Sequence, residues 1–247
     1  MISAIDATDG TLLGGRVRYA QPATGFRSGI EPVLLAAAIP ARAGQRMLEA
    51  GSGAGAGLLC LAARVPGIAG IGIDIDPTLA GMANTNAAAN DCGDLRFVVG
   101  DIVGMAGQEK FDHAFANPPY HPEAGTPSPS AARAVAKIAA PGLFGAWIGA
   151  MARQLRGGGT LSFIVPVTAI PACLAAVEQM GCGSCCLLPL WPRAGRKAKL
   201  AILQTVRGGR GAFQVLPGLI LHEGSGFSAS AEAILRDAAP LTMHPSR

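Results

Sequence analysis

Long apolar runs are missing from this sequence, although half of its 247 residues are hydrophobic. A helix that spans a membrane needs about 20 consecutive apolar residues, so no membrane span is expected. The first residues carry Asp6 and Asp9 and lack a basic segment followed by an apolar one, so no secretory signal is expected either. Charged residues are also few, at 15% of the chain, which leaves room for a generous core. We expect a cytoplasmic protein that is a monomer or a weak homodimer.

A disulfide framework and a metal site are not expected. The six cysteines stand in a chain without an export signal, where disulfides are uncommon. Cys182 and Cys185 have a C-x-x-C spacing, but neither a second such pair nor a pair of histidines follows them. We interpret these cysteines as small side chains packed in or beside an apolar strand.

Acidic residues are almost absent from one long stretch of the chain. Residues 124–222 contain a single acid, Glu178, against ten bases. The ten bases are Arg133, Lys137, Arg153, Arg156, Arg193, Arg196, Lys197, Lys199, Arg207 and Arg210. Such a stretch forms either an ordinary solvated face or a surface that attracts a polyanion such as nucleic acid.

Short apolar runs alternate with helix-like segments through the middle of the sequence, which is the pattern of a parallel α/β sheet. The strands are expected at 46–50, 68–74, 95–99, 111–116 and 160–165. The helices are expected at 57–65, 77–90, 143–155, where three glycines follow, and 166–180. Two late apolar runs, 184–190 and 199–206, are expected to form a hairpin that closes the sheet.

The predicted fold class is therefore α/β, a Rossmann-like sheet with helices on both faces and a small N-terminal hairpin. The hairpin is expected within 10–29, close to a cofactor site. We treat residues 1–247 as one domain, with a hairpin and helix cap (1–44), a catalytic core (45–206) and a tail (207–247).

A glycine-rich turn follows the first core strand, in the segment Glu49-Ala50-Gly51-Ser52-Gly53-Ala54-Gly55. Glycines at such a turn let a ligand approach the backbone closely. Asp74 ends the second strand, where a carboxylate can accept hydrogen bonds from both ribose hydroxyls of an adenosine cofactor. Asp101, after the third strand, could accept one from the adenine amino group.

The identity of the cofactor is left open by the turn alone, since nicotinamide and flavin sites use the same glycine spacing. Glu49 favours S-adenosylmethionine, because that cofactor has a cationic amino acid end and no pyrophosphate. The candidate cofactor-binding residues are Glu49, Gly51, Ser52, Gly53, Gly55, Asp74, Ile75, Asp101, Ile102 and Asn117.

The segment Asn117-Pro118-Pro119-Tyr120 directly follows the fourth strand and is the candidate catalytic motif. Two prolines end the strand and fix the backbone, so the Asn117 side-chain oxygen and a backbone carbonyl become two fixed acceptors. Two acceptors suit a planar amino group, whose lone pair they localise and whose developing positive charge they stabilise. Tyr120 could stack on a planar substrate. His113 and His121 are interpreted as structural or rim residues, and residues 121–130 as a lid-like loop.

With these motifs the chain resembles the bacterial family that forms N6-methyladenosine beside the anticodon of a valine tRNA. The likeness also covers the segments Gly25–Ile30, Trp191–Lys197 and Leu219–Gly224. It implies a seven-stranded class I methyltransferase sheet, S-adenosylmethionine as cofactor and a tRNA substrate. The residues expected to contact RNA are Arg27, Arg133, Lys137, Arg193, Arg196, Lys197, Lys199, Arg207 and Arg210.

Other functions remain open at this point. The same tetrapeptide occurs in enzymes that methylate a glutamine of release factors, and a release factor or ribosomal protein is the alternative substrate. Those enzymes carry a helical domain before the glycine turn, whereas 50 residues precede Gly51 here. A catalytically silent RNA-binding module is a further alternative, and a nicotinamide-dependent oxidoreductase would leave Asn117–Tyr120 unexplained. One departure from the family is Arg133-Ala-Val-Ala-Lys137, where relatives often carry a His-Glu pair.

Overall fold

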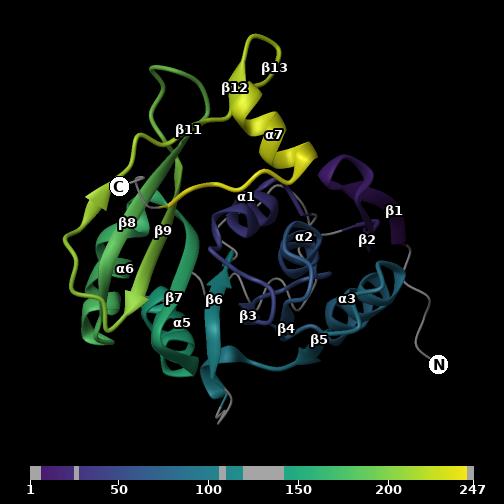
Figure 1. Cartoon of the computed structure of the whole chain (residues 1–247), viewed down its shortest axis with the longest axis horizontal. Helices are drawn as coiled ribbons and strands as arrows, with labels where there is room; N and C mark the ends of the chain where they lie inside the picture. Colours follow the sequence, from purple (N-terminus) through teal and green to yellow (C-terminus); the bar gives the residue numbers. More distant parts are fainter. Residues whose placement is uncertain (1–6, 25–27, 106–109, 119–141, 244–247) are drawn as a thin grey trace.

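A central sheet of nine strands organises the chain in the computed structural model, which describes residues 7–24, 28–105, 110–118 and 142–243 (Figure 1). Seven of the strands are long and run across the sheet in the order β8-β9-β7-β6-β3-β4-β5. Their bounds are β3 Arg46–Ala50, β4 Ala69–Asp74, β5 Leu95–Val99, β6 Phe111–Ala116, β7 Leu155–Pro166, β8 Cys182–Trp191 and β9 Leu200–Arg207. The two-residue strands β10 (Gln214–Val215) and β11 (Leu219–Ile220) both pair with β8. The predicted seven-stranded sheet is therefore confirmed, with two short strands added at one edge.

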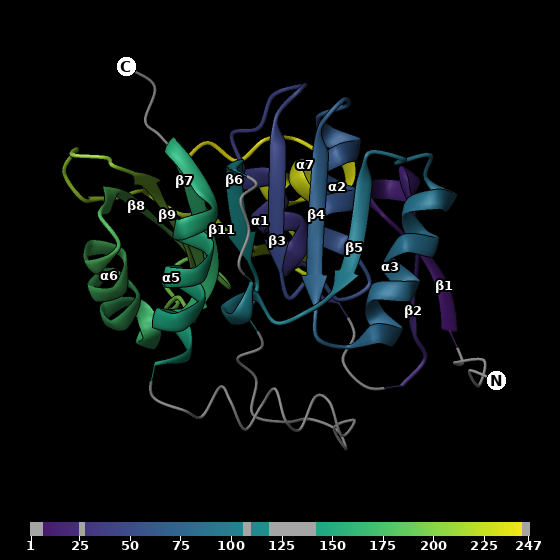
Figure 2. The ribbon, with the colours of Figure 1, turned by 90° about the horizontal axis from the view of Figure 1, so that it is seen from below.

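The strand directions decide which ends lie together. Strands β3 to β7 pair in parallel, whereas β9 is antiparallel to both of its neighbours, β7 and β8. The carboxyl ends of the parallel strands meet at one edge, the lower edge in Figure 2, where the arrowheads of β4 and β5 lie. We call this the carboxyl edge of the sheet and the opposite one the amino edge.

Helices cover both faces of the sheet. Successive side chains along a strand point to opposite faces, so each central strand contributes to both hydrophobic clusters. Met47 packs in the hydrophobic cluster on one face, and Leu48 and Ala50 pack in the cluster on the other. The first face is covered by α1 (Glu31–Ala38), α2 (Ala56–Arg64), α3 (Pro77–Ala89) and α7 (Ala229–Asp237), and the second by α5 (Leu143–Gln154) and α6 (Ile170–Gln179). Figure 2 shows α1, α2 and α7 on the far side of β3 and β4. Both faces of the central strands are thus buried, which suits their almost continuous apolar sequences.

Most predicted elements are found within one or two residues of their expected bounds, with two exceptions. The strand expected at 160–165 begins at Leu155, so the three glycines Gly157–Gly159 lie inside β7 and do not separate helix from strand. The helix expected from residue 166 is preceded by a 3-10 turn, η3 (Val167–Ala169), and α6 starts at Ile170.

The N-terminal hairpin consists of β1 (Ala7–Leu12), the 3-10 turn η1 (Leu13–Gly15) and β2 (Val17–Pro22). Two asparagines of α3 bind its backbone. Asn86 exchanges hydrogen bonds with Ala20, and Asn90 does the same with Arg18. Asn86 also donates to the carbonyl of Ala54 in the glycine turn, at 2.9 Å. These hydrogen bonds attach the hairpin to α3 and, through Asn86, link it to the glycine turn.

The tail forms β11, a small hairpin of β12 (His222–Glu223) and β13 (Gly226–Phe227), and then α7. Ser228 caps α7 by accepting a hydrogen bond from the Ala231 amide. None of the helices in the described ranges has the length and hydropathy of a membrane-spanning segment. All six cysteines are free thiols, and Cys182, Cys185 and Cys186 are buried in β8 as the sequence predicts.

Candidate active site

Three central strands bring the predicted motifs side by side at the carboxyl edge. Ala50 at the end of β3 pairs with Ala116 of β6, so Gly51 and Asn117 leave the sheet next to each other. On the other side Ala50 pairs with Ile73 of β4, and Asp74 follows. Gly100, which precedes Asp101, donates its amide to the Asp74 carbonyl at 2.8 Å. The glycine turn, the ribose-binding candidate and the proline motif therefore belong to one site.

The glycine turn is held against β4. The amides of Gly51 and Ser52 both donate to the Ile73 carbonyl, at 2.8 and 3.0 Å. The Gly53 amide donates to Asp74 Oδ2, and the Asp76 amide donates to Asp74 Oδ1 at 2.9 Å. Backbone amides thus fix the carboxylate in place, and since a carboxylate has about four lone-pair sites it can still accept a hydrogen bond from a ribose hydroxyl.

Asp74, Ser52 and Glu49 are largely buried, and burial raises the pKa of the two acids. Burial raises the pKa of Asp74 above its ordinary value, against the lowering effect of the amides that it binds. The Ser52 hydroxyl is buried and has no hydrogen-bond partner among the described residues. Glu49 is 4% exposed, and burial raises its pKa to about 8 from an ordinary value of 4.5.

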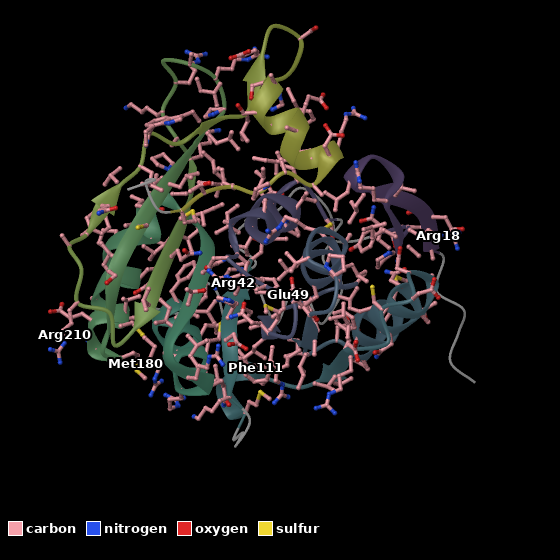
Figure 3. The ribbon with its side chains drawn as sticks, in the orientation of Figure 1. Arg18, Arg42, Glu49, Phe111, Met180 and Arg210 are labelled. Atoms are coloured by element: carbon pink, nitrogen blue, oxygen red, sulfur yellow. The ribbon has the colours of Figure 1, made fainter. Side chains whose placement is uncertain are left out.

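Glu49 lies beneath the glycine turn, in the interior of the molecule (Figure 3). Its Oε2 accepts the Leu58 amide at 3.0 Å, and its Oε1 lies where a side chain on Gly57 would have to be. A side chain at position 57 would therefore displace this carboxylate. An acid buried here without a cation is expensive to ionise, which fits a site that receives a positively charged group.

Asn117 directly follows β6 and carries a buried side-chain acceptor. Its side-chain oxygen Oδ1 is buried and has no hydrogen-bond partner among the described residues, and Pro118 beside it is also buried. A buried carbonyl oxygen without a donor costs about 1–3 kcal/mol. The arrangement therefore suits an N–H donor brought by a substrate. Pro119 and Tyr120, the rest of the predicted catalytic motif, lie outside the described residues.

Trp147 of α5 is a site residue that the sequence analysis missed. Its indole ring stands over Gly51, because a Cβ on that glycine would lie 2.9 Å from Trp147 Cη2. Gly51 also has φ +65°, a left-handed conformation that favours glycine. The only sequence signal was rarity, since the chain has two tryptophans.

Apolar side chains are exposed where an adenine would need them. Ile75 after β4 and Val103 in the turn η2 (Ile102–Gly104) after β5 are each 43% exposed. Ile102, which we expected to bind the cofactor, is 3% exposed and packs in the core. Asp101 uses Oδ1 to accept the Val103 amide at 3.0 Å. The exposed neighbour Val103 is therefore a better candidate than Ile102 for a side-chain contact.

The sheet separates the basic residues into two groups. Leu190 of β8 and Pro166 of β7 both pair with Leu200, so the loop between β8 and β9 lies at the carboxyl edge. That loop carries the exposed side chains of Arg193, Arg196, Lys197 and Lys199. Strands are spaced by about 4.8 Å, which places β9 and β8 about 10 and 15 Å across the sheet from β6.

The second group lies at the amino edge. Arg207 ends β9, which is about 24 Å long at about 3.4 Å per residue, and Arg210 follows it. Arg207 donates to the Ala152 carbonyl at the end of α5. Arg210 lies at the periphery beside Met180, far from Glu49 (Figure 3). The structure thus does not bring Arg207 and Arg210, both expected to contact RNA, to the strand ends that carry the site. Arg27, Arg133 and Lys137 lie outside the described residues, as do His121 and the loop at 121–130.

His113 is structural, as expected. Its ring lies in the middle of the molecule between Thr160 Oγ1, at 2.7 Å, and Gln45 Oε1, at 3.0 Å. Burial, assisted by the charge of Arg42, lowers the pKa of His113 to about 4, so the ring is neutral at physiological pH. In the part of the chain that the structure describes, no three His, Cys, Asp or Glu residues are grouped as metal ligands.

Similarity to known proteins agrees with this geometry. Residues 31–145 match the family model of the methyltransferase small domain. Over 221 residues the chain is 28% identical to the tRNA1(Val) (adenine(37)-N6)-methyltransferase of Dickeya chrysanthemi, covering 86% of this chain and 87% of the relative. A release factor glutamine methyltransferase of Rhodospirillum rubrum is 43% identical over 83 residues, which cover 33% of this chain and 25% of the relative.

The fold has solved counterparts. A crystal structure of a predicted O-methyltransferase from Agrobacterium tumefaciens superposes with a TM-score of 0.70 at 21% identity, covering 85% of this chain and 97% of that one. Its likeness supports the class I methyltransferase sheet, and the matched domain together with the relatives identifies S-adenosylmethionine as the cofactor. Residues 31–145 of the chain thus match the methyltransferase small domain of S-adenosylmethionine-dependent methyltransferases, and the chain resembles the tRNA1(Val) enzymes over most of its length.

Proposed function

We propose that this chain transfers a methyl group to the N6 amino group of an adenine in tRNA, with a valine tRNA as the first substrate to test. The observation that carries the proposal is the buried Oδ1 of Asn117 next to Gly51, which has no hydrogen-bond partner among the residues that the structure describes. An exocyclic amino group carries two N–H donors, and Asn117 Oδ1 would accept one of them. The Pro118 carbonyl is the candidate for the second, and Tyr120 is the candidate ring to stack on the base.

The chemistry follows from holding the amine in this way. S-adenosylmethionine supplies an electrophilic methyl group on a sulfonium sulfur. Acceptors on both N–H groups localise the nitrogen lone pair and stabilise the positive charge that the nitrogen gains as its bond to the methyl carbon forms and the carbon–sulfur bond breaks. The nitrogen then loses one proton to solvent, so no general base is needed. Asp74 and the glycine turn would hold the nucleoside end, with Glu49 facing the cationic amino acid end.

An RNA substrate is favoured over a protein amide by two observations. The similarity to the tRNA1(Val) enzyme extends over 86% of the chain, whereas that to the glutamine methyltransferase covers 33%. The loop between β8 and β9 also presents four cations at the carboxyl edge. A glutamine side chain has the same planar amide, so the release-factor reaction stays the second candidate.

The test is the Asn117→Ala variant with labelled S-adenosylmethionine, an unmodified valine tRNA transcript and, in parallel, a release factor. Wild type should form N6-methyladenosine in the tRNA, and removing one preorganised acceptor should lower kcat at least about a hundredfold. Affinity for S-adenosylhomocysteine is the folding control and should change little. Methylation of the release factor alone, or full tRNA activity in the variant, would refute the proposal.

A further inference from the structure

The tail of the chain folds back onto the loop between β8 and β9. β11 pairs in parallel with the end of β8, Ile220 with Trp191. The Leu221 amide donates to the Trp191 carbonyl at 2.7 Å, and the His222 amide donates to the Pro192 carbonyl at 3.2 Å. Residues 192–199 and the hairpin 222–227 therefore form one continuous surface, which we call the loop–hairpin surface.

Side-chain contacts make this surface a defined structure. Arg193 Nη1 donates to the Gly224 carbonyl in the hairpin turn, at 2.7 Å. Within the hairpin the rings of His222 and Phe227 are stacked, with centroids 4.8 Å apart. At its base Trp191 Nε1 donates to the Pro217 carbonyl at 3.0 Å. The start of the loop is thus held by a folded scaffold.

The loop–hairpin surface has a net positive charge. Its 14 residues contain four bases (Arg193, Arg196, Lys197 and Lys199) and one acid, Glu223, so the net charge is 4 − 1 = +3. All four basic side chains are exposed, and among the described residues none of them forms an ion pair. A compact group of unpaired cations is suited to phosphates, since each bound phosphate releases condensed counterions.

The position of this surface fits a substrate that is already bound at Asn117. Asn117 and the loop lie at the same carboxyl edge, and the strands that carry the loop, β9 and β8, are about 10 and 15 Å across the sheet from β6 at about 4.8 Å per strand. A protein glutamine would need no such neighbour.

We infer that the loop–hairpin surface binds the backbone phosphates of the RNA strand that flanks the target adenine. Arg196, Lys197 and Lys199 make the phosphate contacts, while Arg193 holds the loop to the hairpin. The inference rests on the proposed function and adds to it a docking surface outside the matched domain at 31–145.

The test compares two double variants of the full chain by fluorescence anisotropy with a labelled, unmodified valine tRNA transcript. Arg196→Ala with Lys197→Ala removes two cations of the surface. Arg153→Ala with Arg210→Ala is the matched control and removes two exposed cations at the amino edge. Binding is measured from about 0.05 to 0.3 M salt, where each lost phosphate contact reduces the slope of log K against log salt by about 0.7–0.9.

The surface variant should lose about 1.4–1.8 of the slope, and its affinity at about 0.1 M salt should fall about 25- to 60-fold. Its affinity for S-adenosylhomocysteine should match that of wild type, because the cofactor site is untouched. The control should match wild type in both slope and affinity. Equal losses of tRNA affinity in the two variants, or no loss in the surface variant, would refute the RNA-binding role of the loop–hairpin surface. Formation of N6-methyladenosine by wild type would in that case still support the proposed reaction. Absence of that product would instead remove the proposed function.

Discussion

Replacing Glu49 with Gln should remove a pH dependence of stability between about pH 6.5 and 8. Burial raises the pKa of Glu49 to about 8, from 4.5. Between these two values the folded chain holds a proton that the unfolded chain has lost. The free energy of unfolding therefore falls as the pH rises, by about 1.4 kcal/mol per pH unit. The stabilisation is complete below pH 4.5 and is lost as the pH passes 8.

The titration of His113 sets the lower limit of the pH range in which the effect of Glu49 on stability can be measured. Burial lowers the pKa of its ring to about 4 from 6.5, so between those values stability rises with pH and opposes the effect of Glu49. Above pH 6.5 the ring is neutral in both states. From pH 6.5 to 8 Glu49 should thus lower the stability of wild type by about 2 kcal/mol, at about 1.4 kcal/mol per unit.

Urea unfolding of the cofactor-free chain at several pH values measures this difference. With a denaturant slope of about 2 kcal/mol per M, the wild-type midpoint should fall by about 1 M across the range. Glu49→Gln keeps the acceptor for the Leu58 amide and should show no such fall, whereas Glu178→Gln, an exposed position on α6, should behave as wild type. Parallel curves for wild type and Glu49→Gln would refute the burial argument.

The same variant tests the cation that Glu49 is expected to face. If the ionised carboxylate binds the ammonium of the cofactor, affinity for S-adenosylhomocysteine should rise with pH up to about tenfold between pH 6.5 and 7.5, because ionisation must precede binding. Glu49→Gln should bind more weakly and without this rise. Wild-type affinity that is flat in this range would show that Glu49 supports only the turn.

Two further predictions concern single side chains. In the Trp191→Phe variant the tryptophan fluorescence comes from Trp147 alone, and S-adenosylhomocysteine should change it because this ring stands over Gly51. The fluorescence of Trp147→Phe should not respond to S-adenosylhomocysteine. Equal fluorescence changes in the two variants would contradict the placement of Trp147. Arg207→Ala should lower the free energy of unfolding, measured with urea, by about 1–2 kcal/mol, because the charged hydrogen bond to the Ala152 carbonyl is lost. Its tRNA affinity should not change. A loss of tRNA affinity without a loss of stability would instead assign Arg207 to RNA binding.

The sequence predicts the central sheet well, because its strands are short apolar runs that end in turns. β3, β5 and β6 have the expected bounds, since each is a short, mostly apolar run followed by glycine or asparagine. The predicted start of β7 was wrong. Three glycines usually interrupt a helix or strand, whereas here they lie within the strand, where its register with β6 is irregular.

The site could be predicted only where it depends on local motifs. Gly51 and Asn117 follow their strands and Asp74 is the last residue of β4, so parallel pairing alone brings them together. Trp147 reaches Gly51 from a helix about 100 positions later, a contact that no local pattern encodes. The choice between Ile102 and Val103 was likewise decided by packing, which buries one of two adjacent apolar side chains.

The reversed strand β9 has a consequence for how such an enzyme can acquire a new substrate. Because β9 runs against its neighbours, a loop and a folded tail arrive at the working edge from the end of the chain, while the groups for methyl transfer come from residues 46–118. Helix α7 of the tail packs in the same core cluster as β3 and α2, whereas the loop at 192–199 and the hairpin at 222–227 are largely exposed. Exchange of this loop and hairpin between relatives should therefore retarget the reaction without redesigning its chemistry.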